Sequence, residues 1–329
     1  MKLGLGYVGE SRYEIRDSKG NLVREEGYVK NVILDKFLDV IGGAETYYRD
    51  CMDGCVVGTG TSVPTIEQVG LDAPVKSVGV LSSAKITEFK PVEGDIYRRT
   101  SREAVYRFTG LGNVNLTELG LTSRKDTLTG YNTTRALFKD SSGNNTTLSI
   151  KSDETLDIFY KIWLIHDLRD STGTFNITDG DGVVTEYNYI SRVSNALSNT
   201  SYGDRILAVG LFMDFTNDTN SNRQSSAGTG DIVGVEGKPG GIIYTQGVYK
   251  ASQSTSAYVV GTYKKTVHFS MPLDKGNGNI RSMFLHSNAG QWQVRLGTVD
   301  GDLPFTKTNK DTAYLGLEVS WGRFVEETT

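Results

Sequence analysis

Apolar and polar residues alternate along much of the chain, which is the pattern of β-strands. In the strongest run, one face carries Leu156, Ile158, Tyr160, Ile162 and Leu164. Apolar residues also occur at the intervening positions, so this strand is predicted to lie centrally in a sheet and to be covered on both sides.

A second alternating run lies near the C-terminus. Its apolar positions are Leu315, Leu317, Val319 and Trp321, and small or polar residues stand between them. The pattern predicts a strand with one face in solvent. Near the N-terminus, residues 13–29 form two short extended runs around a turn-rich segment at 17–21, which predicts a β-hairpin.

One segment has helical spacing instead. We predict a short helix over residues 32–41, with Asn31 as its N-cap and with Gly42 and Gly43 ending it. Its apolar stripe is Ile33, Phe37, Leu38 and Ile41. Because such a stripe needs cover, the helix is expected to lie over one end of a sheet.

Turn signals separate the strands. Clusters of Asp, Asn, Ser and Gly occur at 140–145, 179–182 and 300–302. Residues 216–230 have no apolar anchor beyond one alanine, which predicts an exposed loop. The fold class expected is mainly β, with one or two β-sandwich (jelly-roll-like) modules and a short N-terminal helix.

The expected organisation has four parts. An N-terminal hairpin and helix (1–54) precede a first β-sandwich half (55–170), a divergent insertion (171–260) and a second β half that completes the sandwich (261–329). The order of strand, Asp/Gly turn and long alternating strand recurs, with Phe108 matched to Phe269 and Tyr160 to Val319. This recurrence indicates either two similar halves or coincidence.

Composition narrows the functional classes. The chain has 329 residues, 37% of them hydrophobic, which suffices for a core. Its net charge of -4 argues against nucleic-acid binding through bulk charge. The longest apolar runs are too short to span a bilayer. The first residues lack the pattern of a signal peptide, so we expect folding in a cytoplasm with reduced thiols.

Candidate chemistry is sparse. Residues 4–9 spell G-x-G-x-x-G, but a predicted hairpin follows them where a dinucleotide site needs a helix. Cys51 and Cys55 have no second Cys or His pair with which to bind zinc, and the three histidines are far apart. Without a nucleophile motif or a favoured carboxylate pair, we expect no catalytic, cofactor or metal site and no enzymatic activity.

Three groups of segments together carry a family resemblance. They are residues 29–35 with 55–65 and 71–74, residues 115–121 with 134–143 and 154–160, and residues 304–308 with 315–323. In this order they resemble a broad group of tailed-bacteriophage virion proteins of tail, baseplate and tail-fibre modules. The resemblance covers roughly residues 29–165 and 261–323.

The resemblance implies a structural, non-enzymatic virion protein that assembles in several copies in the host cytoplasm. Its partners would be copies of itself and other phage tail or virion proteins, and neither nucleic acid, membrane nor cofactor is expected. The alternatives are a receptor-binding tail appendage that recognises host carbohydrate, and a capsid decoration or collar protein. A glycan-cleaving tail enzyme is a further alternative.

Two sets of residues stand out as candidate sites. Glu118 and Arg135 could form an ion pair that ties a strand end to a loop, or could be two independently solvated charges. For carbohydrate binding the candidates are the aromatic residues Tyr187, Tyr189, Tyr202 and Tyr244. The alternative for these tyrosines is a place in a sheet or an interface.

Overall fold

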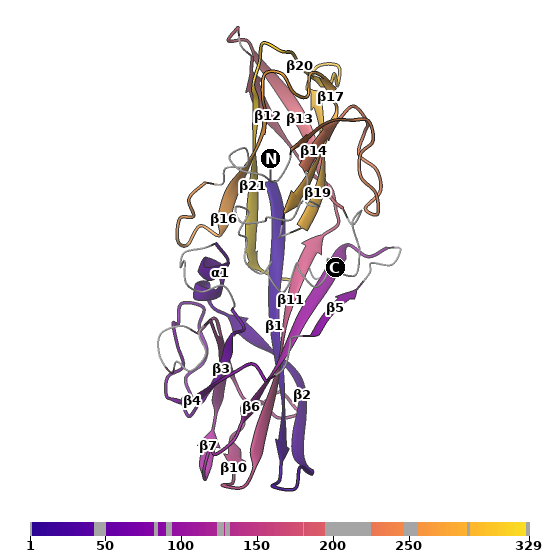
Figure 1. The fold of residues 1–329 in the computed structure, drawn as a ribbon. Helices are drawn as coiled ribbons and strands as arrows, with labels where there is room; N and C mark the ends of the chain where they lie inside the picture. The colour runs from indigo at the N-terminus through magenta and orange to yellow at the C-terminus, as the bar shows by residue number, and fades with distance from the viewer. Residues whose placement is uncertain are drawn as a thin grey trace.

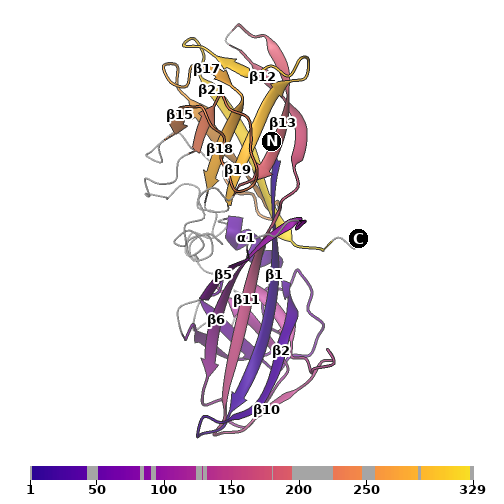
Figure 2. The same cartoon turned by 90° about the vertical axis from the view of Figure 1, so that its right-hand side faces the viewer.

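The computed structural model describes residues 2–42, 51–81, 85–89, 94–123, 128, 132–179, 181–194, 225–246, 256–287 and 290–326. Within these ranges the chain forms twenty-one strands and one helix. The predicted mainly β fold is therefore confirmed. The molecule is elongated and has two lobes, and strand β1 runs from one lobe into the other (Figures 1 and 2).

The larger sheet has eleven strands. Its main path is β4 (Pro74–Gly79), β3 (Gly54–Gly58), β8 (Glu118–Thr122), β9 (Thr134–Leu137), β2 (Leu22–Ile33), β1 (Lys2–Arg16), β11 (Thr155–Asp167), β6 (Tyr97–Phe108) and β5 (Lys85–Phe89). Off this path, β21 (Ala313–Arg323) pairs with the start of β1 in parallel and with β16 (Lys264–Met271) antiparallel. This parallel contact joins the end of the chain to its beginning.

The second sheet has six strands. Their order is β12 (Ser171–Thr178), β13 (Val184–Val193), β19 (Gly290–Thr298), β18 (Ser282–Ser287), β14 (Ser225–Gly228) and β15 (Ile242–Gln246). Two small sheets pair β7 (Val114–Leu116) with β10 (Leu148–Ile150), and β17 (Gly278–Ile280) with β20 (Phe305–Lys307). Strands of the predicted insertion, 171–260, thus share one sheet with strands of 261–329.

Strand β11 lies between β1 and β6, as its pattern predicts. Its inward side chains are buried, but Phe159 and Trp163 on the outer face are only half-buried. Charged side chains cover that face in part, because the Arg12 guanidinium lies 3.5 Å from the Phe159 ring centroid. The prediction of full cover on both faces was therefore wrong for the outer face. Strand β21 has one face exposed to solvent, as its pattern predicts.

Helix α1 (Asp35–Gly42) begins three residues later than predicted. Asn31 is not its cap, because β2 continues to Ile33 and pairs there with β9. The β-branched Val32 and Ile33 favour this extended conformation. The buried residues of the helix are Phe37, Leu38, Val40, Ile41 and Gly42. The Trp321 indole donates a hydrogen bond to the Leu38 carbonyl at 2.8 Å, which fastens the helix to β21.

The predicted exposed loop at 216–230 needs correction. Residues 216–224 lie outside the described residues, but Ser225–Gly228 form β14, which is fully buried between β15 and β18. Small side chains allow this close packing: a Cβ on Gly228 would lie 2.6 Å from the Gly240 carbonyl oxygen. Composition suggested a loop because these small, polar residues lack the bulk that usually marks a buried strand.

The strand registers show that the chain consists of two similar halves. In the first half Phe108 of β6 pairs with Leu156 of β11, and in the second half Phe269 of β16 pairs with Leu315 of β21. This is the correspondence that the sequence indicated. The small sheets match too, since β7 with β10 in one half has its counterpart in β17 with β20 in the other.

The hairpin turns of the two halves repeat one geometry. The Asp17 carboxylate accepts hydrogen bonds from the backbone amides of Lys19 and Asn21 at the β1–β2 turn. At the β12–β13 turn the Asp179 carboxylate accepts from Asp181 and Val183 in the same way. The hairpin β12–β13 is therefore the counterpart of β1–β2. These two turns lie at opposite ends of the molecule (Figure 1).

The halves differ at one strand. In the first half β1 pairs along its length with β11. In the second half the counterparts of these strands, β12 and β21, do not pair, and β21 pairs with the start of β1 instead. Within the described part of the chain, β12 therefore has a paired side, against β13, and an open side.

Candidate functional site

The structure brings Glu118 and Arg135 together. They lie on the adjacent strands β8 and β9, both side chains are fully buried, and Arg135 Nε is 2.9 Å from Glu118 Oε2. Arg135 Nη2 also contacts Asp72 Oδ2 at 2.7 Å, and its guanidinium donates hydrogen bonds to the hydroxyl and the carbonyl of Ser62. A buried charge pair of this kind is stable only when such additional hydrogen bonds are present.

The Glu118 carboxylate also holds two loops. It accepts hydrogen bonds from the backbone amides of Gly60 at 2.9 Å and Ala73 at 2.8 Å. A Cβ on Gly60 would come within 2.5 Å of Glu118 Oε1, so only glycine allows this approach. A hydrogen bond from Ser62 and the charge of Arg135 hold the pKa of Asp72 below its usual value of 3.8.

The second half has a neutral counterpart of this ion pair. Gly58 pairs with Glu118 as Gly228 pairs with Ser282, which makes Ser282 the counterpart of Glu118. The Ser282 hydroxyl donates to the Gly230 carbonyl at 2.6 Å. Gln293 lies on the strand next to Ser282 and holds the same loop with two hydrogen bonds. Its side chain accepts one from the Val233 amide and donates one to the Val233 carbonyl. Both halves thus fasten the corresponding loop, one with charges and one without.

The candidate tyrosines lie in the second half. Tyr187 and Tyr189 are buried in the core, where both rings contact Phe175. Tyr244 is half-buried with its ring centroid 5.9 Å from that of Phe269. Tyr202 lies outside the described residues. The rings of Tyr187 and Tyr189 therefore have no open face for stacking on a sugar.

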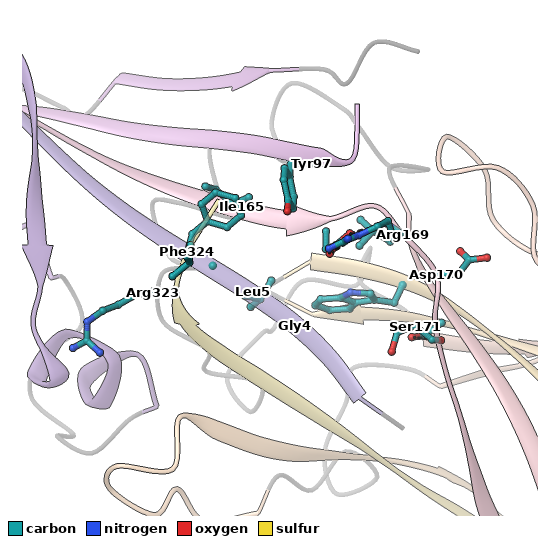
Figure 3. Close-up of a pocket in the computed structure, with 15 residues that line it drawn as sticks. Gly4, Leu5, Tyr97, Ile165, Arg169, Asp170, Ser171, Arg323 and Phe324 are labelled. Carbon is teal, nitrogen blue, oxygen red and sulfur yellow. Dashed lines mark hydrogen bonds and ion pairs between the residues drawn. The ribbon is translucent and has the colours of Figure 1, made fainter. Parts of the chain in front are cut away.

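A groove opens beside the start of β1, the end of β11 and the segment that follows β21 (Figure 3). It has a volume of about 770 Å³, and its lining includes the start of β1, the ends of β11 and β13, and the C-terminal segment 323–325. One wall is aromatic, with the rings of Tyr97 and Phe324 edge to face at 4.9 Å between centroids. The Arg169 guanidinium lies 5.9 Å from the Tyr97 ring.

The charged groups around this groove are engaged in ion pairs. Arg169 Nε lies 2.9 Å from Asp167 Oδ1, and Arg192 holds Asp170 through two contacts of 2.7 Å. Burial opposes ionisation of Asp167, but the hydrogen bonds from Arg169 hold its pKa below 3.8. A carboxylate held in this way is a weak proton acceptor, so the groove suits binding better than acid–base catalysis.

Other candidate chemistry is limited within the described residues. Cys51 and Cys55 are buried and are not joined by a disulfide, and burial raises the pKa of the Cys55 thiol well above its usual range. No group of three or more potential metal ligands occurs in these ranges. None of the described helices is long and apolar enough to cross a membrane.

Sequence reasoning missed Asp72, Ser62 and the groove. Asp72 and Ser62 meet Arg135 through loops whose course depends on tertiary structure, and the groove arises where the halves join. Comparisons of the chain with protein-family models, curated proteins and solved structures found no significant match.

Proposed function

We propose that the chain is a structural, non-enzymatic protein of a tailed-phage virion that assembles in several copies in the tail, baseplate or tail appendages. The proposal starts from the sequence resemblance given above. The structural observation that supports it best is the fastening of loops by the Glu118–Arg135 network.

The network joins segments that carry the resemblance. Glu118 belongs to the segment 115–121 and Arg135 to 134–143, and the loops they hold belong to 55–65 and 71–74. These motif segments therefore meet at one buried point. Since both side chains are fully buried and hold the backbone of the loops, the motifs are best explained as a scaffold.

The second half supports the same interpretation. Ser282 and Gln293 fasten the corresponding loop without a charged group. A catalytic role for Glu118 would need chemistry that its counterpart lacks, whereas a fastening role is shared by both. The elongated body with strands running between its lobes also suits a component that carries load between neighbours (Figure 2).

Gold labelling of purified phage particles with an antibody to this chain tests the proposal. Label at a fixed place on the tail or its appendages is expected. Label on the head surface would favour a capsid decoration protein, and particles without label would contradict the proposal. Incubation of the protein with host-surface polysaccharide should release no new reducing ends, and their release would contradict the non-enzymatic part.

A carbohydrate-binding appendage has less support from the candidate residues, because Tyr187 and Tyr189 are buried. A glycan array separates the two functions. Binding to one class of host glycan would favour the appendage, and an array without signal above background would favour the structural role.

A further inference from the structure

We propose that the open side of strand β12 is a docking edge for the β12 strand of a second copy of this chain, paired antiparallel about a two-fold axis. The first half of the chain shows what this edge can accept. There, the corresponding strand β1 pairs antiparallel with β11 along its length. In the second half β12 keeps its pairing with β13, but its other side has no partner strand among the described residues.

The composition of β12 suits pairing with another strand. Its eight residues, Ser171–Thr178, include no charged residue and no proline. Other outer strands carry features that discourage pairing: β4 begins with Pro74 and contains Lys76, and β16 begins with Lys264 and Lys265. The outer strand β15 is also uncharged, but it is shorter, has a register shift in its pairing with β14 and lies near β16.

The inward side chains of β12 are incompletely covered. Phe175 and Ile177 are half-buried, whereas Tyr187 and Tyr189 on the neighbouring β13 are buried. A strand added beside β12 would cover the exposed parts of Phe175 and Ile177 with its own apolar side chains. This gain applies to both copies because a two-fold interface uses the same surface twice.

A second copy of β12 fits because self-pairing brings no like charges together within the strand. On the outer face, Thr174 and Asn176 would lie close to their equivalents, and polar pairs of this kind are favourable across strands. Antiparallel pairing also places the end of each strand beside the beginning of the other.

The two ends of β12 lie beside each other in the paired copies. The beginning follows Arg169, which borders the groove and is held in an ion pair by Asp167. The end leads into the turn that carries Asp179 and Asp181, followed by Val183 and Val184, which are 57% and 59% exposed. Antiparallel pairing brings this turn of one copy towards the groove of the other. Contact there would cover part of the exposed valines with apolar surface.

Sedimentation velocity of the purified chain over a range of concentrations tests this proposal. The wild-type chain is expected to form dimers. The double variant Thr174→Lys, Asn176→Lys places four lysines across the two-fold axis and should weaken dimerisation by about tenfold or more. The matched control, Val23→Lys with Glu25→Lys on exposed positions of β2, should dimerise like the wild type.

A second variant covers the case in which the lysine variant fails to fold. Val183→Asp with Val184→Asp, on exposed positions next to the turn, should also weaken the dimer. A wild-type chain that stays monomeric, or a dimer that the lysine pair leaves unchanged, would overturn the proposal. Since the assay uses the isolated chain, its outcome is independent of where the protein is found in a particle.

Discussion

Glu118 and Arg135 show how single residues can decide the course of loops in this protein. Neither side chain reaches solvent, and their shared hydrogen bonds extend to Gly60, Asp72 and Ala73. Because the carboxylate accepts hydrogen bonds from backbone amides of two loops, its loss would leave these amides without their acceptor and would remove the buried one of the two carboxylates that pair with Arg135.

The substitution Glu118→Gln should therefore destabilise the protein by about 3 kcal/mol, since it removes the buried counter-charge of Arg135 and leaves only the partly exposed Asp72. Urea denaturation measures this change. Glu318→Gln is the control, because it breaks the exposed pair with Lys264 and should cost less than about 1 kcal/mol. Equal effects of the two substitutions would contradict the fastening role.

The lowered pKa of Asp72 should make the free energy of unfolding depend on pH in the acid range. Its pKa in the folded chain lies below the usual 3.8, so its ionised form stabilises the fold above that pH. This contribution is lost as the pH falls below about 3.8 towards the folded-state pKa. Thermal melts of wild type and Asp72→Asn should thus differ most near neutral pH and converge in acid. A gap that widens in acid would contradict this assignment.

The two cysteines should be unreactive in the folded protein. Both are buried, and the raised pKa of Cys55 keeps its thiol protonated at neutral pH. A thiol reagent should modify neither quickly in buffer and both in urea. Rapid modification of Cys55 without denaturant would show that the interior around it opens readily.

At the scale of elements, local pattern predicted what depends on neighbours in sequence. The β1–β2 hairpin, helix α1 and the long strand β11 follow from alternation, helical spacing and turn residues. The start of α1 and the strand β14 did not follow, because both depend on pairing with distant segments. Asn31 lies in β2 and pairs with Gly9 of β1, and the small residues of β14 pack between β15 and β18.

Helix α1 should contribute strongly to stability through one side chain. Phe37 is fully buried, and its ring lies 5.3 Å from that of Tyr7 on β1. Phe37→Ala should cost about 3–5 kcal/mol, because it leaves a cavity under the helix. Lys36→Ala on the same helix should cost less than about 1 kcal/mol. Similar unfolding midpoints for the two variants would mean that α1 does not seal the core.

At the scale of the whole molecule, the sequence indicated a repeat but not its consequence. The match of Phe108 to Phe269 was visible in the pattern, and the registers show the same correspondence. The pairing of β21 with β1 was not visible, because no local signal marks a parallel contact between the two ends of a chain. That contact takes β21 away from β12 and leaves the edge on which we expect a second copy to bind.

We propose that this protein is built into a particle in several copies and performs no chemistry there. Quantitative mass spectrometry of phage particles, purified from a lysate in which the chain is produced, tests it most directly. The chain should be present at a fixed ratio of several copies per particle. Its absence from the particles, or a ratio well below one copy per particle, would contradict the claim.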